Sequence, residues 1–178
     1  MLFDFEVRAC TRVCAASGKP LQPGDIYFSV LTVETAQTVR HDFAADAWQG
    51  PPEGNLGWWR SRVPGKDTKP KLAPAEVMLN LFVSLADQPQ ESQFRYVLGL
   101  LLIRRKGLRR EESFVDEAEQ EIITVSVPKS DDQYELLVDE PDNEQAQQIQ
   151  QRMIDLLYGD GEIPTTDTSS SNVGDEAA

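Results

Sequence analysis

The residues best suited to chemistry are the two cysteines and the single histidine, Cys10, Cys14 and His41. A cysteine pair with a three-residue gap, a glycine-bearing turn, a hairpin and a histidine is the layout of a treble-clef or LIM-type zinc knuckle. Zinc in such sites takes four ligands, and no second Cys/His pair follows here, so Asp42 or Asp46 would have to be the fourth. We expect no cofactor. The alternatives are a zinc knuckle and a degenerate knuckle that keeps the shape without the metal.

Three tryptophans and a group of cations form the second candidate site. Trp48, Trp58, Trp59, Arg60 and Arg62 are followed by three lysines at positions 66, 69 and 71. Aromatic rings beside cations can stack bases and neutralise phosphates, and they also suit a protein–protein hot spot. Because tryptophan is seldom left exposed in a monomer, we expect at least one of Trp58 and Trp59 to be buried.

A basic run follows the most apolar part of the chain, at Arg104, Arg105, Lys106, Arg109 and Arg110. We interpret these residues as solvated charges at a helix C-terminus, where the helix dipole favours cations. A phosphate or nucleic-acid contact is the alternative.

The sequence carries no motif of the common catalytic classes. A nucleophile elbow, a P-loop, a dinucleotide-binding glycine motif and the zinc-protease motif are all absent. Carboxylates are plentiful, but no feature marks one that is desolvated for acid–base work. We therefore predict that the protein is not an enzyme.

The N-terminal part, residues 1–48, reads as β-rich. Apolar and charged residues alternate over 3–7, which predicts a half-buried strand. Residues 26–33 are β-branched and aromatic, and 38–43 are predicted to be their hairpin partner. The following stretch, residues 49–71, is rich in glycine and proline and is predicted to be a long loop.

Two helices are predicted next. Pro74 suits a first helical turn, and an apolar stripe follows over residues 77–85. Ser92 is the expected N-cap of a second helix, whose residues 94–103 are apolar nearly all round and therefore core-forming. Gly107 is expected to take the left-handed position that ends this helix.

A second hairpin and a last helix complete the predicted domain. Residues 123–127 and 134–138 alternate in the manner of paired strands. Asp142 and Gln145 form a capping box, and the helix that follows is predicted to end at Gly159.

We therefore predict one α+β domain over residues 1–159, in which 72–159 holds the helices and the second hairpin. Residues 160–178 are polar and acidic, and they are expected to be a disordered tail.

The net charge of −13 is distributed unevenly. Residues 1–110 carry 15 Lys or Arg against 11 Asp or Glu, whereas residues 111–178 carry 2 against 19. An acidic chain repels phosphates, so nucleic acid is an unfavoured partner. The acidic N-terminus lacks an apolar leader, and no stretch is long enough to span a membrane. We expect a cytoplasmic protein without membrane contact.

Three segments resemble a family of uncharacterised bacterial proteins of planctomycete type. They are residues 14–31 (CAASGKPLQPGDIYFSVL), 48–61 (WQGPPEGNLGWWRS) and 95–106 (RYVLGLLLIRRK). The resemblance spans roughly residues 8–110, emphasises Cys14 more than Cys10, and implies no activity or catalytic residue. The sequence therefore favours a non-enzymatic binding or adaptor protein, with another protein as its partner.

Overall fold

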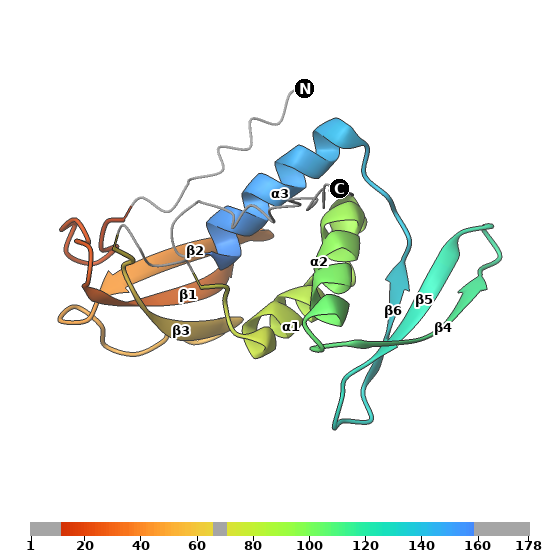
Figure 1. Ribbon diagram of the computed structural model, residues 1–178, viewed down its shortest axis with the longest axis horizontal. Coiled ribbons are helices and arrows are strands. Elements are labelled where there is room, and N and C mark those ends of the chain that lie inside the picture. Colours follow the sequence, from red (N-terminus) through yellow and green to blue (C-terminus); the bar gives the residue numbers. More distant parts are fainter. Residues whose placement is uncertain (1–11, 66–70, 159–178) are drawn as a thin grey trace, which may run out of the picture.

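The computed structural model describes residues 12–65 and 71–158. Two three-stranded antiparallel sheets lie at opposite ends of the molecule, with three α-helices between them (Figure 1). This arrangement confirms the predicted α+β class. The predicted strand at 3–7, Cys10 and the predicted tail at 160–178 lie outside the described residues.

The first sheet contains the predicted N-terminal hairpin. Strand β1 (Ile26–Glu34) pairs with β2 (Gln37–Ala44), and Glu34 lies opposite Gln37. The two turn residues between them, Thr35 and Ala36, have φ values of 50° and 64°. Two successive left-handed residues match the twist of paired strands, so the turn holds the hairpin in register.

The third strand of this sheet corrects the prediction of one loop over residues 49–71. Strand β3 (Gly57–Arg62) pairs antiparallel with β1, giving the order β2-β1-β3. Its side chains alternate: Trp59 is buried, whereas Trp58 and Arg60 are exposed. Glycine and proline dominate the composition around this strand, and this hid its two-residue alternation.

The helices lie close to their predicted positions. They are α1 (Ala75–Ser84), α2 (Ser92–Arg104), which a short 3-10 turn precedes, and α3 (Asn143–Leu157). The capping box of α3 is confirmed, because Asp142 accepts from the backbone of Gln145 while the Gln145 side chain accepts from the backbone of Asp142. Among the described residues, no helix is both long and apolar enough to cross a membrane.

Both ends of α2 differ from the prediction by one residue. Ser92 is the first helical residue and not the cap, and its hydroxyl donates to the Asp139 carboxylate. At the other end Lys106, not Gly107, takes the left-handed conformation, with φ 62°. The backbone N–H of Gly107 reaches Leu102 O, which is the Schellman pattern with Lys106 at the left-handed position.

The second sheet holds the predicted C-terminal hairpin and one strand that we did not predict. Strand β5 (Glu121–Ser126) lies between β4 (Arg109–Val115) and β6 (Gln133–Leu137). All seven residues of β4 are exposed, so no apolar alternation marks it in the sequence. Arg109 and Arg110 therefore begin a strand and do not extend the end of α2.

One hydrophobic core connects both sheets to the helices. Trp59 of the first sheet and Leu136 of the second belong to the same cluster of buried side chains. The buried Arg95 joins two of these elements, since its guanidinium donates to Phe82 O and Glu135 O at 3.0 and 2.8 Å. The inner faces of both sheets are thus occupied, and their outer faces are left to solvent.

Candidate interaction surface

The two faces of the first sheet have different roles, which the strand register fixes. Phe28 lies opposite Phe43 on one side and Arg60 on the other, and Val30 lies opposite Trp58. These residues share the outer face. The residues between them lie on the inner face and are buried: Tyr27, Ser29, Leu31 and Trp59. Leu31 and Trp59 pack in the core with the helices, whereas Tyr27 packs with Leu21 and Val63 in a second, small cluster.

Four aromatic residues gather on the outer face. Trp48, from the connection between β2 and β3, stacks on Phe28 with ring centroids 4.9 Å apart and planes 4° apart. Its ring also lies 5.5 Å from Phe43 and 5.7 Å from Trp58. We call Phe28, Phe43, Trp48 and Trp58 the aromatic face. Such ring pairs add about 0.5–1.5 kcal/mol each beyond simple burial, so the rings hold one another in place.

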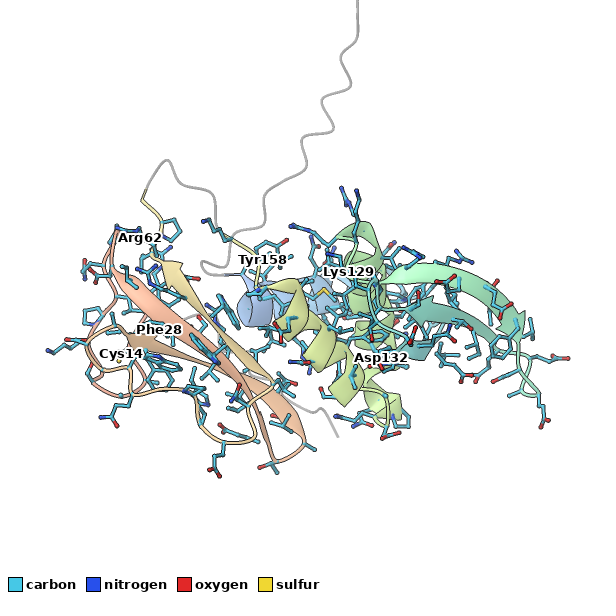
Figure 2. The ribbon with its side chains drawn as sticks, turned by 90° about the horizontal axis from the view of Figure 1, so that it is seen from below. Cys14, Phe28, Arg62, Lys129, Asp132 and Tyr158 are labelled. Carbon is cyan, nitrogen blue, oxygen red and sulfur yellow. The ribbon has the colours of Figure 1, made fainter. Side chains whose placement is uncertain are left out.

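The aromatic face is open to solvent. Trp58 is 45% exposed, and the other three rings are half-buried. Figure 2 shows Phe28 on the first sheet together with Cys14 and Arg62, with Tyr158 displaced toward the helices. The face therefore presents large apolar side chains on the outside of the molecule, where no other described element covers Trp58.

Charged groups border the aromatic face on two sides. Arg60 is exposed beside Phe28, and Arg62 donates to Gly24 O at 3.2 Å. On the other side His41 Nε2 lies 2.7 Å from the Glu34 carboxylate. The hydrogen bond from His41, with a smaller one from Thr32, lowers the pKa of Glu34. Within the part of the chain that the structure describes, neither Arg60 nor Arg62 forms an ion pair, so this side of the border is cationic.

Trp59, which the sequence places among the binding residues, lies in the core instead. Its side chain is 7% exposed, and the Arg40 guanidinium lies 5.3 Å from its ring centroid. The prediction that at least one of the paired tryptophans is buried is confirmed. Neighbouring positions on a strand point to opposite faces, so only Trp58 of the pair can meet a partner.

The buried polar groups beneath the sheet have structural partners. Arg40 Nε binds Asp42 at 2.9 Å, and its Nη1 donates to the carbonyls of Asp155 and Tyr158 at the end of α3. Ser29 donates to Asp42 at 2.5 Å and is 0% exposed. Burial raises the pKa of Asp155, although the Gln151 hydrogen bond and Arg40 oppose this. A hydroxyl enclosed in this way cannot reach a substrate.

Cys14 lies in a tight turn at the end of the same sheet. Its Sγ accepts from Ser17 N at 3.5 Å and from Ala44 N at 3.3 Å, and its carbonyl accepts from Gly18 N. Burial raises the pKa of the Cys14 thiol, but the hydrogen bonds from Ser17 and Ala44 outweigh it, so the pKa is lowered overall. The two amides thus point at the Cys14 sulfur and favour its thiolate form.

The structure does not bring the candidate zinc ligands into one group. Within 12–65 and 71–158, no three His, Cys, Asp or Glu residues are placed to hold a metal ion. His41 is paired with Glu34, and Asp42 is bound by Arg40 and Ser29. The described donor set thus lacks a tetrahedron of ligands, and Cys10 lies outside it.

One cation from each of the two predicted basic runs lines the same hollow, while positions 66 and 69 lie outside the described residues. Lys71 and Arg105 line a hollow of about 490 Å³ together with Tyr158. Both cations are exposed, and the rest of the lining is apolar: Leu72, Ala73, Ala75 and Met78. No buried polar side chain inside it selects a ligand, so the aromatic face remains the stronger candidate.

Comparison with known proteins adds no residue to this surface. The chain matches no protein-family model, no curated protein and no solved structure. The candidate surface therefore rests on its geometry: an aromatic face on the outside of the first sheet, bordered by Arg60.

Proposed function

We propose that this protein is a non-enzymatic binding or adaptor protein that holds a partner protein on its aromatic face. The observation that supports this most is the exposure of Trp58. Its side chain contacts the Phe28 and Trp48 rings on the sheet, yet 45% of it is open to solvent. Tryptophan and arginine side by side are the residue types that dominate binding energy at protein interfaces.

The size of the aromatic side chains makes this exposure costly. An aromatic side chain buries about 150–250 Å², so the open 45% of Trp58 is on the order of 100 Å² and worth roughly 2–3 kcal/mol when covered. A contiguous apolar patch that is exposed on a protein surface commonly marks a site of interaction with another molecule. A partner that covers Trp58 would therefore gain a large share of its affinity from one residue.

A protein is favoured over nucleic acid as the partner. Stacking of bases needs open ring faces, whereas the Phe28 and Trp48 rings already stack on each other. Phosphate binding needs several cations, and this border offers Arg60 and Arg62 on a chain of net charge −13. Cys14 is a free thiol, which supports the proposed location in the reducing cytoplasm.

The test compares two exposed residues of the same sheet. Val33 is 45% exposed, like Trp58, but lies at the end of β1 outside the aromatic face. We expect immobilised wild type and Val33→Ala to retain the same proteins from a cell extract, and Trp58→Ala to lose at least one. Titration of that purified protein should then show binding more than about tenfold weaker to Trp58→Ala. Identical retained sets for all three would reject the proposal.

A second candidate is a zinc-knuckle-like domain with weak nucleic-acid contact. The amide-to-sulfur bonds at Cys14 favour it, because they stabilise the thiolate, which is the form of cysteine that binds a metal. Metal analysis of protein purified without a histidine tag decides this candidate. One zinc per chain, lost in Cys14→Ser, would support it, and substoichiometric zinc would end it and leave a degenerate knuckle.

A further inference from the structure

The polar side-chain atoms of the aromatic face and of Arg60 beside it are all hydrogen-bond donors. Phe28 and Phe43 carry no polar atom, and Trp48 and Trp58 carry one indole N–H each, which donates and cannot accept. Arg60 lies next to Phe28 across the β1–β3 pairing, and a guanidinium likewise has donors only. A ligand that suits this face therefore has to bring acceptors.

These donors are not used inside the protein. Within the part of the chain that the structure describes, the indole N–H groups of Trp48 and Trp58 and the guanidinium of Arg60 donate to no protein acceptor. In the same part, the buried side-chain atom without a hydrogen-bond partner is Gln88 Oε1, so the Trp48 N–H is not a buried orphan but is open to solvent. The three groups are thus available to acceptors from outside.

The carboxylate on the same side of the first sheet is engaged elsewhere. Glu34 Oε1 accepts from the Thr32 hydroxyl at 3.1 Å and lies 2.7 Å from His41 Nε2. Glu34 also lies beside the turn from β1 to β2, at the end of the sheet opposite to Arg62. The centre of the aromatic face consequently offers rings and donors.

The four rings are too close together to admit a side chain between them. Their centroids lie between 4.9 Å apart, for Phe28 and Trp48, and 6.1 Å apart, for Phe28 and Trp58. A group inserted between two rings would touch each at about 3.5–4.0 Å, which requires roughly 7–8 Å between them. A helix that inserts its apolar anchors into a groove is therefore disfavoured. The ligand lies across the rings.

The aromatic face is also too small for a folded domain. Specific interfaces between domains bury about 800 Å² on each partner. An aromatic side chain offers about 150–250 Å² in total, and here Trp58 is 45% exposed while the other three rings are half-buried. The available area is that of a contact with a short segment of chain.

A proline-rich segment has the properties that this face requires. Each proline carries a carbonyl acceptor and no N–H, and its ring is apolar. Such segments adopt the polyproline II helix, in which no carbonyl is used internally, and they are recognised by aromatic side chains. Because this helix is already formed before binding, little ordering entropy opposes a small contact.

We propose that the aromatic face binds a proline-rich segment in the polyproline II conformation, with an acidic residue beside its prolines. The inference rests on the proposed function of the aromatic face as a binding surface, and it names the kind of segment by which the partner protein is held. A proline ring of the segment lies on Trp58, its carbonyls accept from the indole N–H groups of Trp48 and Trp58, and its carboxylate pairs with Arg60.

The spacing of the two ends of this contact is compatible. Trp58 and Arg60 are two residues apart on β3, which is about 7 Å along a strand. A polyproline II helix has three residues per turn and rises about 3.1 Å per residue, so a residue one turn from a proline lies about 9 Å away on the same side. The long side chain of Arg60 can cover this difference, and the acidic residue is therefore expected about one turn from the proline on Trp58.

The test uses a synthetic peptide of about ten residues, proline throughout except for a glutamate at each end, so that either chain direction can place a carboxylate near Arg60. One control peptide has serine in place of proline, and another has lysine in place of glutamate. Each is titrated to about 1 mM into 15N-labelled protein while NMR follows the indole N–H signals of the three tryptophans. The buried Trp59 is the internal control.

We expect the Trp48 and Trp58 signals to shift and saturate with a Kd below about 1 mM, while the Trp59 signal stays in place. The serine peptide should bind at least about tenfold more weakly, because its backbone N–H groups and its flexibility oppose the contact. No saturable shift at Trp58, or equal binding of the serine peptide, would overturn the inference.

Substitutions at Trp58 separate the ring from its donor. Trp58→Ala should bind the proline peptide more than about tenfold more weakly, and Trp58→Phe, which keeps a ring without the N–H, should fall between this variant and wild type. Val33→Ala is the control and should bind as wild type does. An unchanged Trp59 signal shows that each variant is folded. Wild-type affinity in folded Trp58→Ala would contradict the proposed contact.

A charge reversal covers the case in which Trp58→Ala loses its fold. Arg60 is exposed, so Arg60→Glu leaves the core untouched. Wild type should bind the glutamate peptide more tightly than the lysine peptide, and Arg60→Glu should reverse this preference. The same preference in both proteins would overturn the inference that the segment is acidic beside its prolines.

The result is separable from that of the proposed function. If Trp58→Ala loses a protein from the extract while the proline peptide does not bind wild type, the proline-rich segment is ruled out and the binding function stands. If the peptide binds through Trp58 but no protein from the extract depends on Trp58, the inference stands and the proposed adaptor function fails.

Discussion

Both sheets have three antiparallel strands, in the order β2-β1-β3 in the first and β4-β5-β6 in the second, and their outer faces differ in chemistry. Residues 12–65, which form the first sheet, hold five Lys or Arg and five Asp or Glu, and they display the aromatic face. Residues 109–140, which form the second, hold three against eleven. Both inner faces supply apolar side chains to one core, and that of the first sheet also holds the buried Arg40–Asp42 pair.

This contrast separates the demands of folding from those of binding. A core accepts any apolar set of suitable volume, so the inner faces can be built alike. The outer faces are free of that demand. Aromatic residues are concentrated on one outer face and carboxylates on the other. These outer faces are therefore the surfaces from which a function can be inferred.

The largest expected effect distinguishes the inner and outer faces of β3. Trp59→Ala should lower the free energy of unfolding by about 3–5 kcal/mol, because it empties a buried site. Trp58→Ala should cost only about 1–2 kcal/mol, since the ring is already half in solvent. Urea denaturation measures both. Equal losses for the two variants would mean that Trp58 serves the core, and the contrast between the faces would fail.

The next prediction compares two glycines at which a sheet packs closely against a helix, one for each sheet. A Cβ added at Gly57 would lie 2.6 Å from a methyl of Val77, and one added at Gly99 would lie 2.6 Å from a methyl of Leu136. Each alanine substitution should cost about 1–3 kcal/mol through overpacking. The β-branched side chain of Val77 has little rotational freedom, whereas the Leu136 side chain can change rotamer. Gly57→Ala should therefore lower the Tm more than Gly99→Ala. The reverse order would show that the second sheet packs more rigidly.

A smaller effect concerns pH and the contact of α3 with the first sheet. Because burial raises the pKa of Asp155, the folded protein binds this proton more tightly than the unfolded chain. Asp155 therefore removes stability as the pH rises from its ordinary pKa of 3.8 through the raised value, and above that value the penalty is constant. The stability difference between Asp155→Asn and wild type should grow over this interval. Denaturation at several pH values measures it, and a flat difference would contradict the burial effect.

The smallest effect compares one turn from each sheet. Ala36 and Lys129 both hold positive φ, at 64° and 70°. Glycine adopts this conformation without steric cost, so Ala36→Gly and Lys129→Gly should each stabilise the protein by about 0.5–1 kcal/mol. Differential scanning calorimetry should show a small rise in Tm for both. Thr38→Gly, inside β2, is the matched control and should lower the Tm.

Much of the fold follows from local patterns in the sequence. The two hairpins and α3 are predictable because alternation and the Asp142–Gln145 capping box act over a few residues. Strand β4 was missed because all its residues are exposed, and β3 because glycine and proline surround it. A strand without a buried face shows no apolar alternation in the sequence. A short strand flanked by many glycines and prolines is likewise difficult to distinguish from a loop.

The candidate site was predictable only in part. Trp48, Trp58, Arg60 and Arg62 were identified from their residue types, and the structure places them on or beside one outer face. Phe28 and Phe43 were missed as members of that face, since their side follows from the pairing of β1 with its neighbours. Which of two adjacent tryptophans is exposed likewise depends on that register.

The hold of Arg40 on the end of α3 has a consequence for synthesis of the chain. The carbonyls that its guanidinium reaches belong to Asp155 and Tyr158, more than one hundred residues later. Until the nascent chain includes these residues, Arg40 lacks both acceptors, and α3 cannot pack on the inner face of the first sheet. The packing of the first sheet against α3 therefore forms only after residue 158 has been synthesised, so this part of the fold depends on contacts of high sequence separation.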